Sequence, residues 1–302
     1  MKPFLACDWG TTNLRAWRVG AGGAVEAHRD FPLGVSQLKP GEAAARFRDE
    51  VRPALGAENL PALLCGMVGS DLGWKTLAYK DCPADLATLA GGLVTVESDG
   101  PPVRIVPGLR CEGLDGPDVM RGEETQVLGW LELDPARKRG RRLLCHPGTH
   151  AKWVLVEEGR VVRFLTAMTG ELFAVLRAHS VLRSDAPPDD EAAFDAGLHA
   201  AGDGGALAAR LFGTRSRVVG GAMAAPAAPS YLSGLLIGAE LAALPGLLGV
   251  GAEEEIALLG DPALCRWYER ALRRRGLAFS AHDGDTAALA GLKALLAIGV
   301  RP

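Results

Sequence analysis

Two short turns in the sequence combine the residue types that bind phosphate. The first is Asp8–Arg15 (DWGTTNLR), which follows a short apolar run. A turn rich in glycine and hydroxyls can aim several backbone N–H groups at one point, and such an array suits anionic oxygens. The acid of this turn would repel phosphate directly, so we expect a divalent cation between them, Mg²⁺ with its water shell. A plain hairpin turn is the simpler alternative.

The second turn reads HPGTH and spans 146–150. Its Gly-Thr pair at 148–149 aligns with the pair at 10–11, and His146 aligns with Asp8. Each turn stands in a stretch of the form strand, polar turn, strand, glycine turn, strand, helix. Since the match falls at the same place in both stretches, we interpret them as a weak internal repeat of about half the chain.

The elements that must position these turns follow from the spacing of apolar residues. The first stretch predicts strands over 4–7, 14–19, 25–31, 62–67 and 103–106, and helices over 42–51 and 118–133. The second predicts strands over 142–145, 152–156 and 160–167, and a helix over 171–179. A basic connector at 133–142 separates them, and 183–191 reads as a surface loop.

Composition limits the class of protein. Hydrophobic residues make up 48% of the 302, enough for one large or two medium domains with true cores. The net charge of −3 gives no reason to expect a nucleic acid or membrane partner. The six cysteines form no C-x-x-C pair, and four of them lie in or beside apolar runs, where buried thiols of a reducing compartment are usually found. With too few apolar N-terminal residues for a signal peptide and no transmembrane run, we expect a soluble cytoplasmic protein.

Other nucleotide and catalytic motifs are missing. The sequence contains no P-loop, no protein-kinase motif set and no G-x-S-x-G nucleophile elbow. A G-x-G at 20–22 has Val25 in place of the third glycine of a dinucleotide fingerprint. The phosphate-binding hypothesis therefore depends on the two turns.

The first turn resembles the first phosphate motif of the actin, hexokinase and Hsp70 superfamily. The finer resemblance is to the 2-keto-3-deoxy-galactonokinase family, and it runs from end to end. The stretches that carry it are Asp8–Arg15, Cys65–Ser70, Pro117–Gln126, Pro147–Trp153 and Tyr231–Gly238. His146-Pro147 departs from the superfamily pattern, in which the second turn often carries an acid.

The resemblance implies an α/β fold of two ribonuclease-H-like (actin-like ATPase) domains with a nucleotide and substrate cleft between them. Residues 1–138 would form the substrate-side domain with the first phosphate turn. Residues 139–302 would carry the second turn and an adenosine loop, and the last helix, 286–298, would pack back on the first domain. A homodimer is compatible with this arrangement.

The same resemblance assigns roles around ATP and Mg²⁺. Asp8 would hold the metal, and Arg15 or Lys152 would add positive charge at the transferred group, although Lys152 could instead be a surface cross-strand partner. Leu258–Leu264 is similar to the superfamily's adenosine-side loop, with an ordinary strand-to-helix turn as the alternative. The residues expected at the nucleotide are Asp8, Gly10, Thr11, Thr12, Arg15, Gly148, Thr149, His150, Lys152 and Gly260.

Phosphoryl transfer also needs a base for the attacking hydroxyl. Asp118 is expected to open the helix over 118–133, and an aspartate at a similar place is the base in sugar kinases of the superfamily. A plain helix N-cap is the alternative role for Asp118. Glu123 and Glu124 are the next candidates for the base.

The substrate implied by the family is 2-dehydro-3-deoxy-D-galactonate, phosphorylated at its terminal 6-hydroxyl in galactonate breakdown. Its carboxylate calls for an arginine, a lysine or a helix N-terminus. The substrate-side candidates are Ser70, Trp74, Lys75, Arg121 and Glu123. Two alternatives remain: another sugar or sugar-acid kinase of the same fold, such as a gluconate or glucose kinase, and a non-catalytic or chaperone-like ATP-binding protein.

Overall fold

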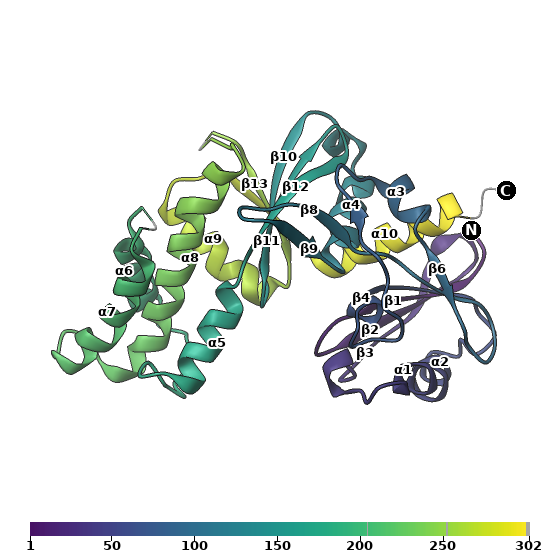
Figure 1. Ribbon diagram of the computed structural model, residues 1–302, viewed down its shortest axis with the longest axis horizontal. Coiled ribbons are helices and arrows are strands. Elements are labelled where there is room, and N and C mark those ends of the chain that lie inside the picture. The colour runs from purple at the N-terminus through teal and green to yellow at the C-terminus, as the bar shows by residue number, and fades with distance from the viewer. Residues whose placement is uncertain (204, 252, 300–302) are drawn as a thin grey trace. The chain divides into compact units, whose positions relative to one another are not determined.

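The computed structural model describes residues 1–203, 205–251 and 253–299 (Figure 1). The chain divides into two compact units that interleave along the sequence. Unit 1 comprises Met1–Arg141, Val156–Arg163 and the C-terminal stretch from Gly284. Unit 2 comprises Arg142–Leu155 and Phe164–Asp283.

Unit 1 is built on a six-stranded sheet of order β3-β2-β1-β4-β7-β6. Its strands are β1 (Phe4–Trp9), β2 (Leu14–Val19), β3 (Val25–Phe31), β4 (Ala62–Gly66), β6 (Val94–Val96) and β7 (Val103–Ile105). β1 runs antiparallel to β2 and parallel to β4, which is parallel to β7. The carboxyl ends of the parallel strands β1, β4 and β7 therefore lie at the same end of the sheet, and this is the end at which open α/β sheets bind ligands.

Helices of unit 1 are mostly short. They are α1 (Glu42–Arg46) with the π-helix η3 (Phe47–Val51), α2 (Arg52–Ala54), α3 (Leu86–Ala90), α4 (Glu123–Leu133) and α10 (Gly284–Gly299), with 3-10 turns η1 (Ala21–Gly23), η2 (Val35–Gln37), η4 (Met67–Gly69) and η5 (Pro135–Lys138). The core is anchored by Trp9, whose ring lies 6.2 Å from that of Phe47. The Trp9 indole N–H donates to the Leu33 carbonyl at 2.6 Å, so the residue next to Asp8 is held rigidly.

The predicted helix over 118–133 is wrong at its start, because 117–120 forms a strand. A small sheet contains β5 (Lys80–Asp81), β8 (Leu109–Glu112) and β9 (Pro117–Met120), and its register places Asp118 opposite Cys111. Gly122, with φ of 117°, then adopts a backbone conformation open mainly to glycine. The helix begins only after this residue.

Helices α4 and α10 cross at backbone contact distance. A methyl group added at Gly129 would lie 1.9 Å from the Ala287 carbonyl, and one at Gly291 would lie 2.2 Å from the Thr125 carbonyl. Only glycine fits at either position. The crossing fixes the first turn of α4 relative to the first turn of α10, and both turns carry acids.

The second sheet, most of which belongs to unit 2, has the order β12-β11-β10-β13-β14. Its strands are β10 (Arg141–His146), β11 (Ala151–Glu157), β12 (Arg160–Ala167), β13 (Ile256–Gly260) and β14 (Phe279–Asp283). In chain order this is third, second, first, fourth, fifth. The first sheet has the same order in β3-β2-β1-β4, followed there by β7 and β6. The shared order confirms the internal repeat, and the parallel strands β10, β13 and β14 again end at one edge.

Unit 2 contains a layer of helices, most of which apolar spacing did not predict; the helix predicted over 171–179 and the helix that follows Gly260 are the exceptions. Its helices are α5 (Thr169–His179), α6 (Glu191–Ala201), α7 (Leu207–Val219), η6 (Ala225–Ala227), α8 (Ala228–Leu247) and α9 (Pro262–Arg274). α6, α7 and α8 lie side by side (Figure 1). The segment Ala225–Leu247 is long and apolar enough to cross a membrane, but 67% of its most apolar window is buried in the protein. A buried core helix passes the same test, so this is weak evidence for a span.

Candidate active site

The first phosphate turn begins at Asp8, on which three elements of unit 1 converge. Arg15 lies opposite it on β2, and the Arg15 Nη2 stands 3.1 Å from Asp8 Oδ2. The same oxygen accepts a hydrogen bond of 3.2 Å from Gln126 Nε2 on α4. The other terminal nitrogen of Arg15, Nη1, pairs with Asp285 in the first turn of α10. The acid of the turn is thus held by a strand and two helices.

The charges around Asp8 favour a cation. Asp8 is 4% exposed, and burial raises its pKa, an effect opposed by Arg15 and reinforced by Asp285 and Glu123. In the part of the chain that the structure describes, no group of three or more acids, histidines or cysteines could hold a metal. A Mg²⁺ ion at Asp8 would therefore keep most of its water and phosphate ligands, as this ion prefers.

The backbone of the first turn is shaped by a segment that sequence reasoning missed. Gly10 N–H donates to the Asn13 carbonyl, while the carbonyls of Gly10 and Thr11 accept from Val35 and Ser36 at 3.1 Å. Thr11 and Thr12 are exposed, so their hydroxyls face solvent or a ligand. Only the run Pro-Leu-Gly at 32–34 signalled that η2 and its preceding glycine would support the turn.

The first turn of α4 carries two acids with different surroundings. Glu124 is fully buried, and its carboxylate accepts from Gly122 N–H at 2.6 Å and from the Thr125 hydroxyl at 2.9 Å. Burial raises the pKa of Glu124 to about 8, with the neighbouring Glu123 adding to the shift. Glu123 is half-buried, and its Oε2 accepts from the Arg121 backbone N–H at 3.1 Å.

The raised pKa of Glu124 predicts an unusual dependence of folding stability on pH. Between about pH 4.5 and about pH 8 the unfolded state ionises at this residue while the folded state stays protonated. Stability therefore falls as pH rises through this window, by roughly 1.4 kcal/mol per unit for an isolated group. The glutamine of Glu124→Gln cannot ionise, so this variant does not lose stability as pH rises. Its Tm should therefore exceed that of the wild type at the upper end of the window and match it at the lower end. Parallel Tm profiles across the window would contradict this assignment.

Asp118 stands on β9 rather than at a helix start, which corrects the position from which its role was inferred. It is half-buried, and its Oδ1 accepts from the next backbone N–H, that of Val119, at 2.8 Å. The helix-start position belongs to Glu123. Pairing with β8 overrides the N-cap signal of an aspartate after Gly-Pro.

The loop after β4 contains the other substrate-side candidates of unit 1. The Ser70 hydroxyl donates to the Met67 carbonyl at 2.7 Å, so this residue shapes the loop. The half-buried Trp74 packs its ring 5.7 Å from that of Phe47. Lys75 is exposed, whereas Arg121 is buried beneath the loop.

The second turn lies in unit 2 and is supported by α5. Gly170 approaches it so closely that an added methyl would lie 2.4 Å from the Gly148 carbonyl, and Glu171 N–H donates to the Thr149 carbonyl at 2.9 Å. The His150 ring pairs with the Glu171 carboxylate. Thr149 and His150 are exposed and are therefore open to a ligand.

Lys152 and Gly260 lie beside this turn. Lys152 is buried rather than a surface partner, and its ammonium donates to the His150 carbonyl at 3.3 Å. Gly260 ends β13, and an added methyl there would lie 3.7 Å from the Pro147 carbonyl. Asp261 follows and caps α9 with hydrogen bonds to the Ala263 and Leu264 N–H groups, so the predicted strand, turn and helix are confirmed.

A buried glutamate of α8, which sequence reasoning also missed, ties the elements around the second turn together. Glu240 accepts from the Trp153 indole at 2.6 Å, from the Tyr268 hydroxyl at 2.9 Å and from the Thr169 hydroxyl. Burial raises its pKa, and all three hydrogen bonds favour the ionised form. The signal was a lone acid inside the apolar run LLIGAELAAL.

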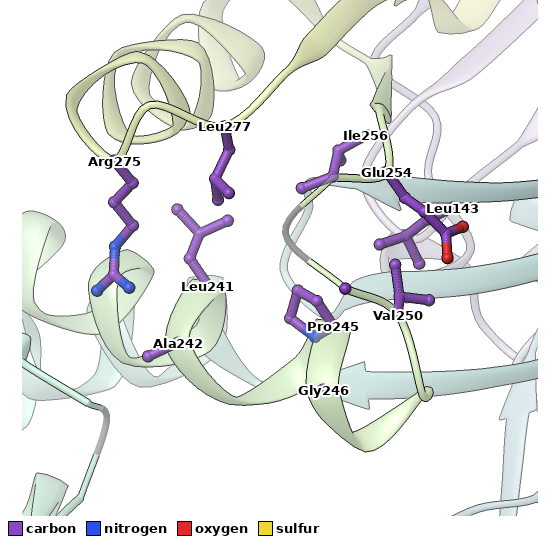
Figure 2. Close-up of a pocket in the computed structure, with 11 residues that line it drawn as sticks. Leu143, Leu241, Ala242, Pro245, Gly246, Val250, Glu254, Ile256, Arg275 and Leu277 are labelled. Atoms are coloured by element: carbon purple, nitrogen blue, oxygen red, sulfur yellow. The ribbon is translucent and has the colours of Figure 1, made fainter.

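Unit 2 contains a cavity of about 370 Å³, which Figure 2 shows with the residues that line it. Leu143 and Ile256, near the starts of β10 and β13, line one part of it, and Leu241 and Pro245 of α8 line another. The second turn follows the opposite ends of these strands. We therefore assign this cavity no part in phosphate binding.

Comparisons with known proteins agree with the geometry. A family model described as 2-keto-3-deoxy-galactonokinase matches residues 8–295. A probable 2-dehydro-3-deoxygalactonokinase of Rhizobium meliloti (strain 1021) is 37% identical over 297 residues, which cover 96% of this chain and 95% of the relative. The 2-dehydro-3-deoxygalactonokinase of Escherichia coli (strain K12) is 36% identical over 294 residues, which cover 97% of each chain.

Solved structures support the fold. A crystal structure from Sinorhizobium meliloti, provisionally named a 2-dehydro-3-deoxygalactonokinase, is 36% identical, with a TM-score of 0.85 over 97% of each chain. Two distant structures, 12% and 14% identical with TM-scores of 0.52 and 0.53 over at least 96% of each chain, share the fold alone. Together with the repeated strand order, they confirm the α/β fold with two ribonuclease-H-like halves.

Proposed function

The chain belongs to the 2-keto-3-deoxy-galactonokinase family, and from that premise we propose that it phosphorylates 2-dehydro-3-deoxy-D-galactonate at its 6-hydroxyl with ATP. One observation carries the proposal beyond the family match. The stretch Arg121–Gln126 leads into the first turn of α4 and places the Gln126 side chain in hydrogen-bond contact with Asp8. Substrate-side and nucleotide-side residues therefore meet within a single unit.

The phosphate-binding roles follow the two turns. Gly10, Thr11 and Thr12 would donate to phosphate oxygens from unit 1, and Gly148, Thr149 and His150 would do so from unit 2, with Lys152 adding charge. The exposure of the hydroxyls and of His150 supports this. Gly260 would border the adenosine.

Asp8 would hold Mg²⁺ through its water shell, and the ion would supply charge neutralisation at the phosphates. Because Arg15 is shared between Asp8 and Asp285, we assign it to orienting the Asp8 carboxylate rather than to binding phosphate alone. Gln126 fixes the same carboxylate from the other side.

We propose Glu123 as the base that takes the proton of the 6-hydroxyl. It is half-buried, at the start of α4, and close enough to Asp8 to raise the pKa of that carboxyl. Glu124 is wholly buried and has two donors already, so it supports the turn. Asp118 remains the alternative base.

The setting we propose is the cytoplasm. All six cysteines are free, and five of them are buried, as expected for a reducing compartment. Burial raises the pKa of the Cys65 thiol, so it stays protonated and unreactive.

A substrate panel tests the proposed function. We expect the kcat/KM for 2-dehydro-3-deoxygalactonate to exceed that for the neutral glucose, galactose or glycerol by at least about 100-fold, since charge-assisted hydrogen bonds to a carboxylate contribute about 1.5–3 kcal/mol each. Gluconate has the carboxylate but carries hydroxyls at C2 and C3, where the substrate has a carbonyl and a methylene, so we expect it to be used less well than the substrate. Coupled ADP release measures each rate. Equal efficiency with a neutral hexose would leave only a sugar kinase, and efficient use of gluconate would make this a different sugar-acid kinase.

A further inference from the structure

Arg121 is a buried cation with unused hydrogen-bonding capacity. Its side chain is 7% exposed, and its Nη2 donates to the Leu77 carbonyl at 2.8 Å. Its Nε and Nη1 atoms are buried and have no hydrogen-bond partner among residues 1–203, 205–251 and 253–299. Buried charges in proteins are normally paired and fully hydrogen-bonded, because a buried donor without a partner has lost its hydrogen bonds to water and has gained none in the protein. An anion bound at Arg121 would supply the missing acceptors.

The surroundings of Arg121 form one side of the proposed substrate region. Gly69 allows the guanidinium to pack against its backbone, since a methyl added there would lie 3.0 Å from Arg121 Nη1. The Tyr79 ring stacks on the guanidinium, 4.3 Å from its central carbon, and Tyr79 is itself 36% exposed. Along the chain, Arg121 is two residues from Glu123, the proposed base.

The Tyr79 ring covers Arg121 and stands at the end of a loop, residues 70–79, that contains no helix or strand. Hydrogen bonds hold this loop to η4, among them Trp74 N–H to the Val68 carbonyl at 2.8 Å and Leu77 N–H to the Gly69 carbonyl at 3.0 Å. Leu77 is buried in the core and Trp74 packs against the core, so the movable part of the cover is the Tyr79 side chain. Shifting the partly exposed Tyr79 ring uncovers one face of the guanidinium. An anion that enters past the displaced ring would accept from the Nε and Nη1 N–H groups, which point outward in the plane of the guanidinium.

Lys75, the other cation of this region, does not lack hydrogen-bond partners in the way that Arg121 does. It is exposed, so its ammonium is hydrated in the free protein and gains little from an added carboxylate. A planar guanidinium also matches the two oxygens of a carboxylate better than an ammonium does.

We infer that Arg121 is the anchor for the carboxylate of the substrate, with Tyr79 as its removable cover. The inference rests on the proposed function, which supplies the sugar acid. It makes Arg121 the residue that distinguishes an acid from a neutral molecule of the same shape, while Glu123 acts at the other end of the six-carbon chain.

The test compares 2-dehydro-3-deoxygalactonate with its C1 amide, which has the same size without the charge. In the wild type we expect kcat/KM for the acid to exceed that for the amide by at least about 100-fold. In Arg121→Gln this ratio should fall to within about 3-fold of unity, mainly through KM for the acid. The ratio is internal to each variant, so a reduced folded fraction cancels.

Matched variants separate this role from its rivals. Arg110→Gln changes an exposed arginine that contacts Asp81 at 2.7 Å, and it should keep the wild-type ratio. Gly69→Ala should lower the acid-to-amide ratio by displacing the guanidinium. This variant provides the same test if Arg121→Gln does not fold. A wild-type ratio retained in folded Arg121→Gln, or lost instead in Lys75→Gln, would overturn the inference.

Calorimetric titration of the acid into the ATP-free protein gives a readout independent of turnover. We expect binding to the wild type and a loss of at least about 10-fold in affinity for Arg121→Gln. Failure of the wild type to phosphorylate the acid while Arg121 still governs its binding would count against the proposed function alone. Equal affinity of the wild type and Arg121→Gln for the acid would count against the carboxylate anchor.

Discussion

Glu123→Gln is expected to lower kcat by at least about 100-fold, the lower end of the usual contribution of a general base. Glutamine has the same size and retains an oxygen that can accept from the Arg121 N–H, so the start of α4 should be preserved. What it loses is the ability to take a proton from the 6-hydroxyl. Binding of ATP and of the sugar acid should change little, so the loss should fall on kcat rather than on KM.

Asp118→Asn is the matched comparison, because it also replaces a half-buried carboxylate by its amide. Asp118 lies on β9 and satisfies the neighbouring Val119 N–H, so we expect its kcat to stay within about 3-fold of wild type. Rapid-quench measurement of the phosphorylated product in one turnover isolates the chemical step. A large loss in Asp118→Asn with near-normal turnover in Glu123→Gln would return the role of base to Asp118.

The parts of the site that could be predicted from sequence are those fixed by local chemistry. Glycine with hydroxyls after an apolar run marked both turns, and the bounds of β2, β3 and β12 agree with the predicted ranges. The start of α4 could not be found this way, since it depends on β8, which pairs with β9 across a tight turn. The N-cap preference of an aspartate was weaker than this strand pairing.

Contacts between residues far apart in the chain could not be predicted from local pattern. Arg15 was expected at the nucleotide and the last helix on the first domain, but the pairing of Arg15 with Asp285 at the start of α10 was not predicted. The position of α10 in unit 1 depends on Gly129 and Gly291, and apolar spacing gave no sign that these glycines let two helices cross at backbone contact distance. Glu240 gave a signal, a lone acid in an apolar helix, but its three donors come from three separate elements.

Asp8→Asn should separate stability from activity. Burial raises the pKa of Asp8, so its ionised form is disfavoured in the fold even though Arg15 opposes the shift. The amide keeps the size of the side chain and removes the buried charge, while Arg15 retains Asp285 as a partner. We therefore expect the Tm at neutral pH to be equal to or above that of wild type. A residue whose charge costs stability and is nevertheless present is expected to serve the reaction.

The activity of Asp8→Asn should fall because a metal bound at this turn would lose the one carboxylate that residues 8–15 offer to its water shell. The Mg²⁺ concentration at half-maximal rate should rise by about 10–100-fold, the range for residues that act on a metal through its water, and added Mg²⁺ should restore part of the rate. Asp30→Asn is the control, since Asp30 lies opposite Arg15 on β3 but faces solvent and contacts His28 at 3.1 Å. Mn²⁺ binding in the presence of ATP, followed by electron paramagnetic resonance, measures the same affinity without turnover. If Asp8→Asn binds Mn²⁺ and responds to Mg²⁺ as wild type does, Asp8 is only a residue of the turn, and the metal is held by other ligands.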